Sequence, residues 1–123
     1  MNIEDYRNYC LAKKGVTEEF PFDEETLVFK VMGKMFALTS LKRWEEGDES
    51  VNLKCDPDRA IELREQYECI NPGFHMSKKH WNTVQINNGE LSEQLICELI
   101  DHSYKLVVNG LTKKLKEELK NYK

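Results

Sequence analysis

The residues best suited to chemistry lie close together in the stretch NPGFHMSKKHWNTVQI, which spans residues 71–86. It contains the imidazoles of His75 and His80, the ammonium groups of Lys78 and Lys79, and the indole of Trp81. Imidazoles serve as acid–base groups or metal ligands, whereas lysines contact phosphates and aromatic rings stack on bases. The stretch could therefore be a catalytic site, a metal site, a nucleic-acid contact or a packed corner of a β-hairpin.

A nucleophilic active site has little support in the sequence. Such a site needs a nucleophile, a base and an orienting group, and the chain has neither a GxSxG motif nor a catalytic-cysteine signature. His75 and His80 could still meet Cys55 or Cys69 in space, but spacing alone does not bring them together. The paired carboxylates lie in exposed connections such as residues 18–25, where solvated charge is expected. We therefore predict that the protein is not an enzyme.

Metal and nucleotide sites have no better support. His75 and His80 have a spacing that zinc sites use, but Cys69 is the one thiol nearby and a structural zinc typically needs four ligands. Neither GxGxxG nor GxxxxGK(S/T) occurs. We expect no metal and no cofactor. The cysteines form no CxxC pair, and apolar patterns around three of the four predict buried, reduced thiols at most of these positions: Cys10, Cys55, Cys69 and Cys97.

A binding surface is the functional interpretation that remains. Cations meet phosphates, an aromatic ring stacks on bases, and an amide reads base edges. These groups occur together at Lys78, Lys79, His80, Trp81 and Asn82. A second basic face could come from Lys113, Lys114, Lys116 and Lys120. The alternative is that Trp81 packs in a hairpin corner and that the lysines are merely solvated.

Periodicity and capping signals predict the elements that position these residues. Helices are expected to begin after N-caps at Asn2, Asp56, Ser92 and Thr112. Alternating apolar residues in LVFKVMGKMFALTS predict a β-hairpin with Gly33-Lys34 as its turn, and further strands are expected over 51–55, 69–74 and 82–86. The acidic stretch VTEEFPFDEET is expected to be an extended connection, and LKRWEEGDES an exposed loop.

The resulting order is α-β(3)-α-β(2)-α with an additional C-terminal helix. Because the hairpin requires antiparallel pairing, we predict a two-layer α+β fold in which helices pack on one face of an antiparallel sheet of about five strands. A chain of 123 residues fits one domain, spanning residues 1–123.

Charge and hydropathy indicate in which compartment the protein lies and which partners it can bind. The formal net charge is −4, which weighs against strong non-specific binding to nucleic acid. Residues 105–123 differ from the rest, because they contain six basic and two acidic residues. The N-terminus has acidic residues where a signal peptide would be basic and then apolar, and no apolar run approaches the roughly 18 residues that span a bilayer. We expect a cytoplasmic protein without a membrane partner.

Residues 51–84, VNLKCDPDRAIELREQYECINPGFHMSKKHWNTV, resemble the central signature of the MmcQ/YjbR family of small bacterial proteins. The segments KVMGKMFAL (30–38), SYKLVVNGLTKKL (103–115) and EEFPFDEET extend the likeness over nearly the whole chain. Thr112 stands where family members commonly have proline, and as a capping residue it preserves the helix start. The resemblance implies a two-layer fold like that of type III secretion chaperones.

The resemblance also implies a function. The family is described as DNA-binding, with paired wing-like β elements making the contacts, and no catalytic residues are attributed to it. For this chain it implies double-stranded DNA as the partner and a contact set of Lys78, Lys79, His80, Trp81 and Asn82, with His75 shaping the site and Lys34 at the hairpin tip. The alternative is a protein-interaction or chaperone-like dimeric module with no nucleic-acid role, in which a partner protein or a second copy is bound.

Overall fold

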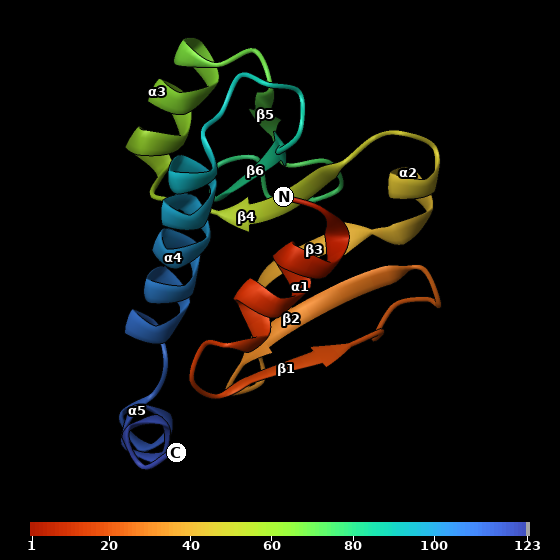
Figure 1. Cartoon of the computed structure of the whole chain (residues 1–123). Helices are drawn as coiled ribbons and strands as arrows, with labels where there is room; N and C mark the ends of the chain where they lie inside the picture. Colours follow the sequence, from red (N-terminus) through yellow and green to blue (C-terminus); the bar gives the residue numbers. More distant parts are fainter. Residues whose placement is uncertain (123) are drawn as a thin grey trace.

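A six-stranded antiparallel sheet, ordered β1-β2-β3-β4-β6-β5, carries most of the helices on one face, and the short helix α2 lies beyond one end of the strands (Figure 1). The structure is a computed structural model that describes residues 1–122. Its strands are β1 (Val16–Glu19), β2 (Thr26–Val31), β3 (Lys34–Ser40), β4 (Ser50–Lys54), β5 (Ile70–Pro72) and β6 (Trp81–Gln85). Its helices are α1 (Ile3–Leu11), α2 (Leu41–Glu45), α3 (Pro57–Gln66), α4 (Glu93–Asn109) and α5 (Lys113–Lys120). The predicted α+β class is confirmed.

The helices begin where their capping residues predict. In each case the N-cap side chain accepts a hydrogen bond from the backbone amide three residues later, which satisfies one of the amides left free at a helix start. This holds at Asn2, Asp56, Ser92 and Thr112. The longest helix, α4, has 17 residues, and no helix within residues 1–122 is long and apolar enough to cross a membrane.

The turn of the β2–β3 hairpin lies one residue earlier than predicted. Its two central residues are Met32 and Gly33, with φ of 50° and 83°, so both lie in the left-handed region. A two-residue turn with positive φ at both positions matches the twist of the flanking strands. Lys34 is therefore the first residue of β3 rather than a turn residue.

Two segments that were expected to be irregular contain regular structure. Val16–Glu19 forms the edge strand β1, paired with β2 from Val16↔Val31 to Glu19↔Val28, so the sheet has six strands rather than about five. Residues 41–45 form the short helix α2, because the Ser40 hydroxyl caps it and the Trp44 indole donates to Thr39 Oγ1 at 2.8 Å. Both segments are rich in charged residues, which favoured the prediction of irregular structure; β1 is stabilised by pairing with β2, and α2 by contacts within residues 39–45.

The core lies between the sheet and the helices. The buried strand side chains on this side include Leu27, Phe29 and Val31 of β2, and they pack with buried residues of α1, α3, α4 and α5. Because side chains alternate along a strand, Val28 points to the other side of the sheet. There Val28, Leu38 and Trp81 form a small separate cluster with Met35 and Met76. We refer to this side of the sheet as the open face.

Candidate functional site

The segment between β5 and β6, residues 73–80, folds back tightly over the end of the sheet. Gly73 donates a backbone hydrogen bond to Trp81 O at 2.8 Å, and a Cβ at Gly73 would lie 2.8 Å from Trp81 Cβ and 3.0 Å from Met76 Cβ. Glycine is therefore required for this close approach. The backbone amide of Trp81 closes the following turn by donating to Ser77 O at 2.9 Å.

Arg64 of α3 holds this turn from the helix side. Its Nε donates to Asn82 Oδ1 at 2.7 Å, and its Nη2 donates to the backbone oxygens of Lys78 and Trp81. A planar guanidinium suits this role because its donors point in fixed directions. The position of the turn that contains Lys78 and Lys79 therefore depends on Arg64, which lies 14 positions before Lys78 in the chain.

The expectation that Trp81 and Asn82 are available for contact is wrong. Trp81 is 8% exposed and packs with Val28 and Leu38 on the open face, and Asn82 is 2% exposed. The indole therefore cannot stack on a base at the surface. The Asn82 amide oxygen is used by Arg64, so this residue orders the segment instead of reading a partner.

Lys78, Lys79 and His80 are exposed, and Lys34 lies at the same end of the sheet. The register pairs Ala37 of β3 with Leu53 of β4, and Leu53 with Asn82 of β6. Lys34 lies three residues before Ala37, and Lys79 lies three residues before Asn82. Because β3 and β6 are both antiparallel to β4, they run in the same direction, and both lysines lie toward the same end of the sheet. Since adjacent strands are about 4.8 Å apart and two strand spacings separate β3 from β6, the ends of these strands, at which Lys34 and the turn before Trp81 lie, are on the order of 10 Å apart.

Helix α5 adds lysines to this end of the molecule. Leu119 of α5 and the Met32 side chain both lie against Gly15, so α5 packs beside the β2–β3 turn (Figure 1). We call this end the basic end and define it by six exposed lysines: Lys34, Lys78, Lys79, Lys113, Lys114 and Lys116. None of the six is within salt-bridge distance of a carboxylate in residues 1–122. Carboxylates do occur nearby, at Asp56, Asp58, Glu117 and Glu118.

Acidic residues are concentrated at the opposite end of the sheet. They precede β2, follow β3 and precede β4, and antiparallel pairing brings these three strand ends together. The residues concerned are Asp23, Glu24, Glu25, Glu45, Glu46, Asp48 and Glu49. The net charge of −4 is therefore unevenly distributed over the molecule, and the local charge at the basic end is positive although the total is negative.

His75 and His80 occupy different environments. His75 lines a pocket on the open face, whereas His80 does not line it. The backbone oxygen of His80 accepts a hydrogen bond from the Cys55 amide at 2.8 Å, where β4 ends and β6 begins. Within residues 1–122 no group of three or more His, Cys, Asp and Glu side chains is placed to hold a metal ion.

The cysteines are poor nucleophiles in this environment. Cys10, Cys55 and Cys69 are buried, as predicted, and Cys97 is half-buried. Burial raises the pKa of the Cys55 thiol to about 11 and that of Cys69 to about 11, so both thiols are protonated at neutral pH. A thiolate is the reactive form of cysteine.

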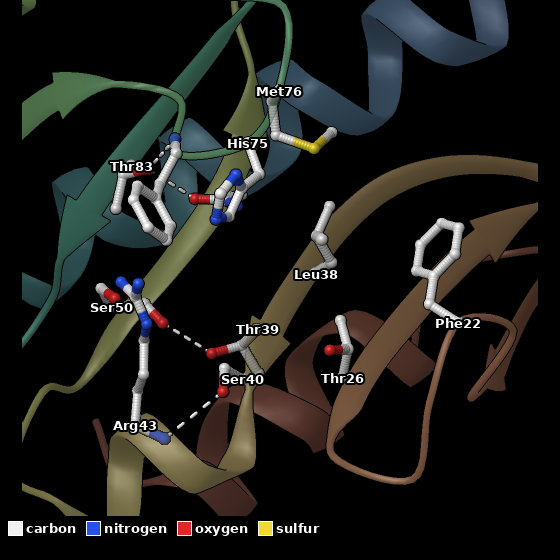
Figure 2. Close-up of a pocket in the computed structure, with 12 residues that line it drawn as sticks. Phe22, Thr26, Leu38, Thr39, Ser40, Arg43, Ser50, His75, Met76 and Thr83 are labelled. Atoms are coloured by element: carbon white, nitrogen blue, oxygen red, sulfur yellow. Dashed lines mark hydrogen bonds between the residues drawn. The ribbon is translucent and has the colours of Figure 1, made fainter.

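The pocket on the open face has a volume of about 410 Å³, and we call it the open-face pocket (Figure 2). Phe22 comes from the β1–β2 connection, and Phe74, His75 and Met76 come from residues 73–80. Figure 2 shows Leu38 of β3 between Phe22 and His75, with Arg43 of α2 at one margin. The remaining lining residues are Thr26, Thr39, Ser40, Ser50, Asn52 and Thr83.

Phe22, Arg43 and Arg64 were not predicted as functional residues. The sequence signal for Phe22 was an aromatic residue in an acidic connection, where no strand or helix could bury it; it is 64% exposed. Arg43 and Arg64 had no comparable signal. Their roles depend on contacts with Phe74, Lys78 and Asn82, which are distant in the sequence.

Comparison with known proteins identifies a family and several relatives of this chain. Residues 11–106 match the model of a protein family described as YjbR. The uncharacterised protein YbdF of Escherichia coli O157:H7 is 44% identical over 95 residues, covering 77% of this chain and 75% of that protein. The uncharacterised protein YjbR of Escherichia coli K12 is 34% identical over 111 residues, covering 90% of this chain and 91% of that protein.

Solved structures have the same fold. The crystal structure of protein DR2400 from Deinococcus radiodurans superimposes with a TM-score of 0.86 at 41% identity, covering 96% of this chain and 87% of that chain. A crystal structure of a Pseudomonas syringae protein gives a TM-score of 0.70 at 26% identity, covering 86% of this chain and 98% of that chain.

Proposed function

The chain belongs to the YjbR family, and from this premise we propose that it is a non-enzymatic protein that binds double-stranded DNA through its basic end. Lys78 and Lys79 contact phosphates together with Lys34, and the exposed His80 imidazole lies beside them. Trp81 and Asn82 belong to the supporting structure of this surface, since both are buried. The proposal assigns no chemical step to the protein.

One observation carries the proposal: the exposed lysines of the β2–β3 hairpin, of the 73–80 segment and of α5 have no carboxylate partner within salt-bridge distance in residues 1–122. Phosphate binding is driven by cations that displace counterions from the duplex. Unpaired lysines supply that charge, whereas lysines in ion pairs must first give up a partner. Lys78 Nζ also donates to Gly73 O at 3.3 Å, a contact that positions its charge without neutralising it.

The acidic end of the molecule is consistent with this binding mode. It is repelled by phosphates, so the protein would approach a duplex with the basic end first. Specific base contacts are not part of the proposal, because the side chains expected to read bases are buried. Binding should therefore be weak, sensitive to salt and tolerant of DNA sequence.

Fluorescence anisotropy of a labelled duplex, titrated at several salt concentrations, tests the proposal. If about three to five phosphates are neutralised, the logarithm of the binding constant should fall with the logarithm of salt concentration with a slope of about −3 to −4.5. The double substitution Lys78→Ala/Lys79→Ala should reduce the magnitude of this slope by about one to two and weaken binding about tenfold or more. The matched control is Lys42→Ala, an exposed lysine of α2 at the acidic end.

Two results would contradict the proposal. One is an absence of duplex binding at low salt, and the other is equal binding by the wild type and the Lys78→Ala/Lys79→Ala variant. A loss of binding that Lys42→Ala reproduces would indicate a general charge effect rather than a site.

A second candidate function is a dimeric protein-interaction module. The edge strand β1 pairs with β2 on one side, and Phe20 beyond its end is 48% exposed. An edge strand offers unpaired backbone groups to another chain. Analytical ultracentrifugation over a range of protein concentrations tests this candidate: a dimer that dissociates on Phe20→Ser substitution supports it, and a strict monomer opposes it.

A further inference from the structure

We propose that the open-face pocket binds a small organic acid with a flat aromatic body, whose ring packs against Phe22 and Leu38 and whose acidic group meets Arg43. None of the six lysines of the basic end lines this pocket, and its residues take no part in the proposed DNA contact. The inference therefore stands independently of the proposed function.

The shape of the pocket suits a small molecule. Its volume of about 410 Å³ lies within the range of roughly 300–1,000 Å³ that is typical of ligand sites. Two separate connections form its walls over a floor of strand residues, so the cavity is concave rather than a flat part of the sheet (Figure 2). Phe22 is 64% exposed, which leaves a ring face available to a flat partner, whereas Arg43 and His75 flank the Phe74 ring.

The charges in the pocket select an acid over a base. Among its lining residues, Arg43 is cationic, His75 can become so, and no aspartate or glutamate is present. The Arg43 guanidinium lies 4.1 Å from the centre of the Phe74 ring. Its nearest carboxylate, Asp48, is at 3.5 Å, and both side chains are about one-third exposed, so this ion pair is weak. The guanidinium therefore has donors free for a bidentate contact with a ligand acid.

The polar floor of the pocket offers an amide donor. Thr83 Oγ1 accepts from the Phe74 amide at 2.9 Å and donates to Asn52 Oδ1 at 2.6 Å. These bonds use the acceptor oxygen of Asn52 and leave its Nδ2 without a partner in residues 1–122. An acidic ligand supplies an acceptor for this donor.

The pocket wall formed by residues 74–76 contains a residue with an uncommon backbone conformation. His75 has φ of 58°, in the left-handed region, and its ring centre lies 4.0 Å from that of Phe74. Strained residues of this kind persist where the surrounding structure determines them, and they are common at ligand sites. Phe74 is thus positioned by His75 on one side and Arg43 on the other.

Binding of anilinonaphthalene sulfonate, a flat aromatic acid with environment-sensitive fluorescence, tests the inference. N-phenylnaphthylamine is its uncharged counterpart. The wild type should bind one sulfonate molecule per chain, with amide shifts in two-dimensional NMR spectra centred on Phe74, His75 and Thr83. Arg43→Met should weaken sulfonate binding about tenfold, the effect of one charge-assisted contact, and change binding of the uncharged probe much less. Phe22→Ala should weaken binding of both probes.

The controls separate the site from general effects. Lys42→Met removes a neighbouring exposed cation that does not line the pocket, and it should bind both probes like the wild type. Phe22→Ala is preferred to a core substitution because Phe22 is exposed and its loss should not unfold the chain. Non-saturable binding, amide shifts scattered over the molecule, or unchanged sulfonate affinity in Arg43→Met would overturn the inference. The Lys78→Ala/Lys79→Ala variant should keep probe binding, so failure of the two proposals can be told apart.

Discussion

Among single residues, Arg64 has the largest influence on where the exposed lysines lie. Its guanidinium donates to two backbone oxygens and to the Asn82 amide, and it thereby joins α3 to the turn that precedes β6. Asn82 is buried, and its Nδ2 already lacks a partner within residues 1–122. Removing the Arg64 side chain would leave the amide oxygen of Asn82 without a partner as well, which is costly in a buried position.

We expect Arg64→Met to lower the free energy of unfolding by about 2–3 kcal/mol, because a charged donor is lost to the amide oxygen of the buried Asn82. Urea denaturation measures the change. The matched control is Arg59→Met in the same helix, where the guanidinium pairs with the half-exposed Glu98 at 2.7 Å. Its loss should cost less than about 1 kcal/mol. Equal effects of the two substitutions would show that Arg64 does not hold the segment as described.

Among elements, α4 organises the ends of β3 and β4. The Ser103 hydroxyl accepts from the Lys54 amide at 2.9 Å and donates to Phe36 O, and His102 Nε2 accepts from the Asp56 amide at 3.2 Å. One turn of α4 therefore satisfies backbone groups of two strands and of the start of α3. Burial, with a smaller contribution from Arg59, lowers the pKa of His102 below its usual value.

This pKa shift predicts a pH dependence of stability. The unfolded chain binds a proton at His102 near its usual pKa of about 6.5, whereas the folded chain binds it at lower pH. The stability associated with neutral His102 is therefore complete above that pH and is lost as the pH falls through the folded-state pKa. Urea denaturation at about pH 7.5 and about pH 5.5 should show this loss in the wild type.

The matched variant is His102→Gln, which keeps an acceptor for the Asp56 amide but has no charge to gain. It should lose less stability than the wild type between the two pH values. Hydrogen bonds lower the pKa of Glu18, through Arg7, and of Glu90, through Cys69, so these groups titrate below this range. An identical loss in both proteins would contradict the assignment to His102.

For the whole molecule, the relevant property is the separation of charge between the two ends of the sheet. Helix α5, which carries the exposed Lys113, Lys114 and Lys116, packs through Leu119 near the β2–β3 turn, and the acidic connections lie at the other end. If the proposed DNA contact uses the whole basic end, it must include α5 as well as the turn at Lys78 and Lys79. If it uses the turn alone, α5 should not matter.

We therefore expect Lys113→Gln/Lys116→Gln to weaken duplex binding and to reduce the magnitude of the salt slope by about one to two. Anisotropy at several salt concentrations measures both quantities, and circular dichroism verifies that α5 is retained. Lys42→Gln, at the acidic end, is the control and should leave binding nearly unchanged. Binding by the double variant that matches the wild type would confine the contact to the Lys78–Lys79 turn.

Elements whose signals are local could be predicted from the sequence. Asn2, Asp56, Ser92 and Thr112 cap their helices through bonds that span three residues, so the local chain contains the whole signal. Strand β1 could not be predicted in this way, because Val16 pairs with Val31 of another strand. Helix α2 has a local cap at Ser40, but its five residues are too few for a periodic apolar pattern.

The sequence by itself determined the α+β class, the helix starts, the buried cysteines and the family, because each follows from composition, periodicity or short motifs. Only the tertiary structure decided which residues of 71–86 are accessible. It buried Trp81 and Asn82, exposed Lys78 and Lys79 at one end with Lys34, and placed His75 in a pocket with Arg43. The physical reason is that exposure and charge proximity depend on strand register and on contacts between segments distant in the chain, which local spacing does not contain.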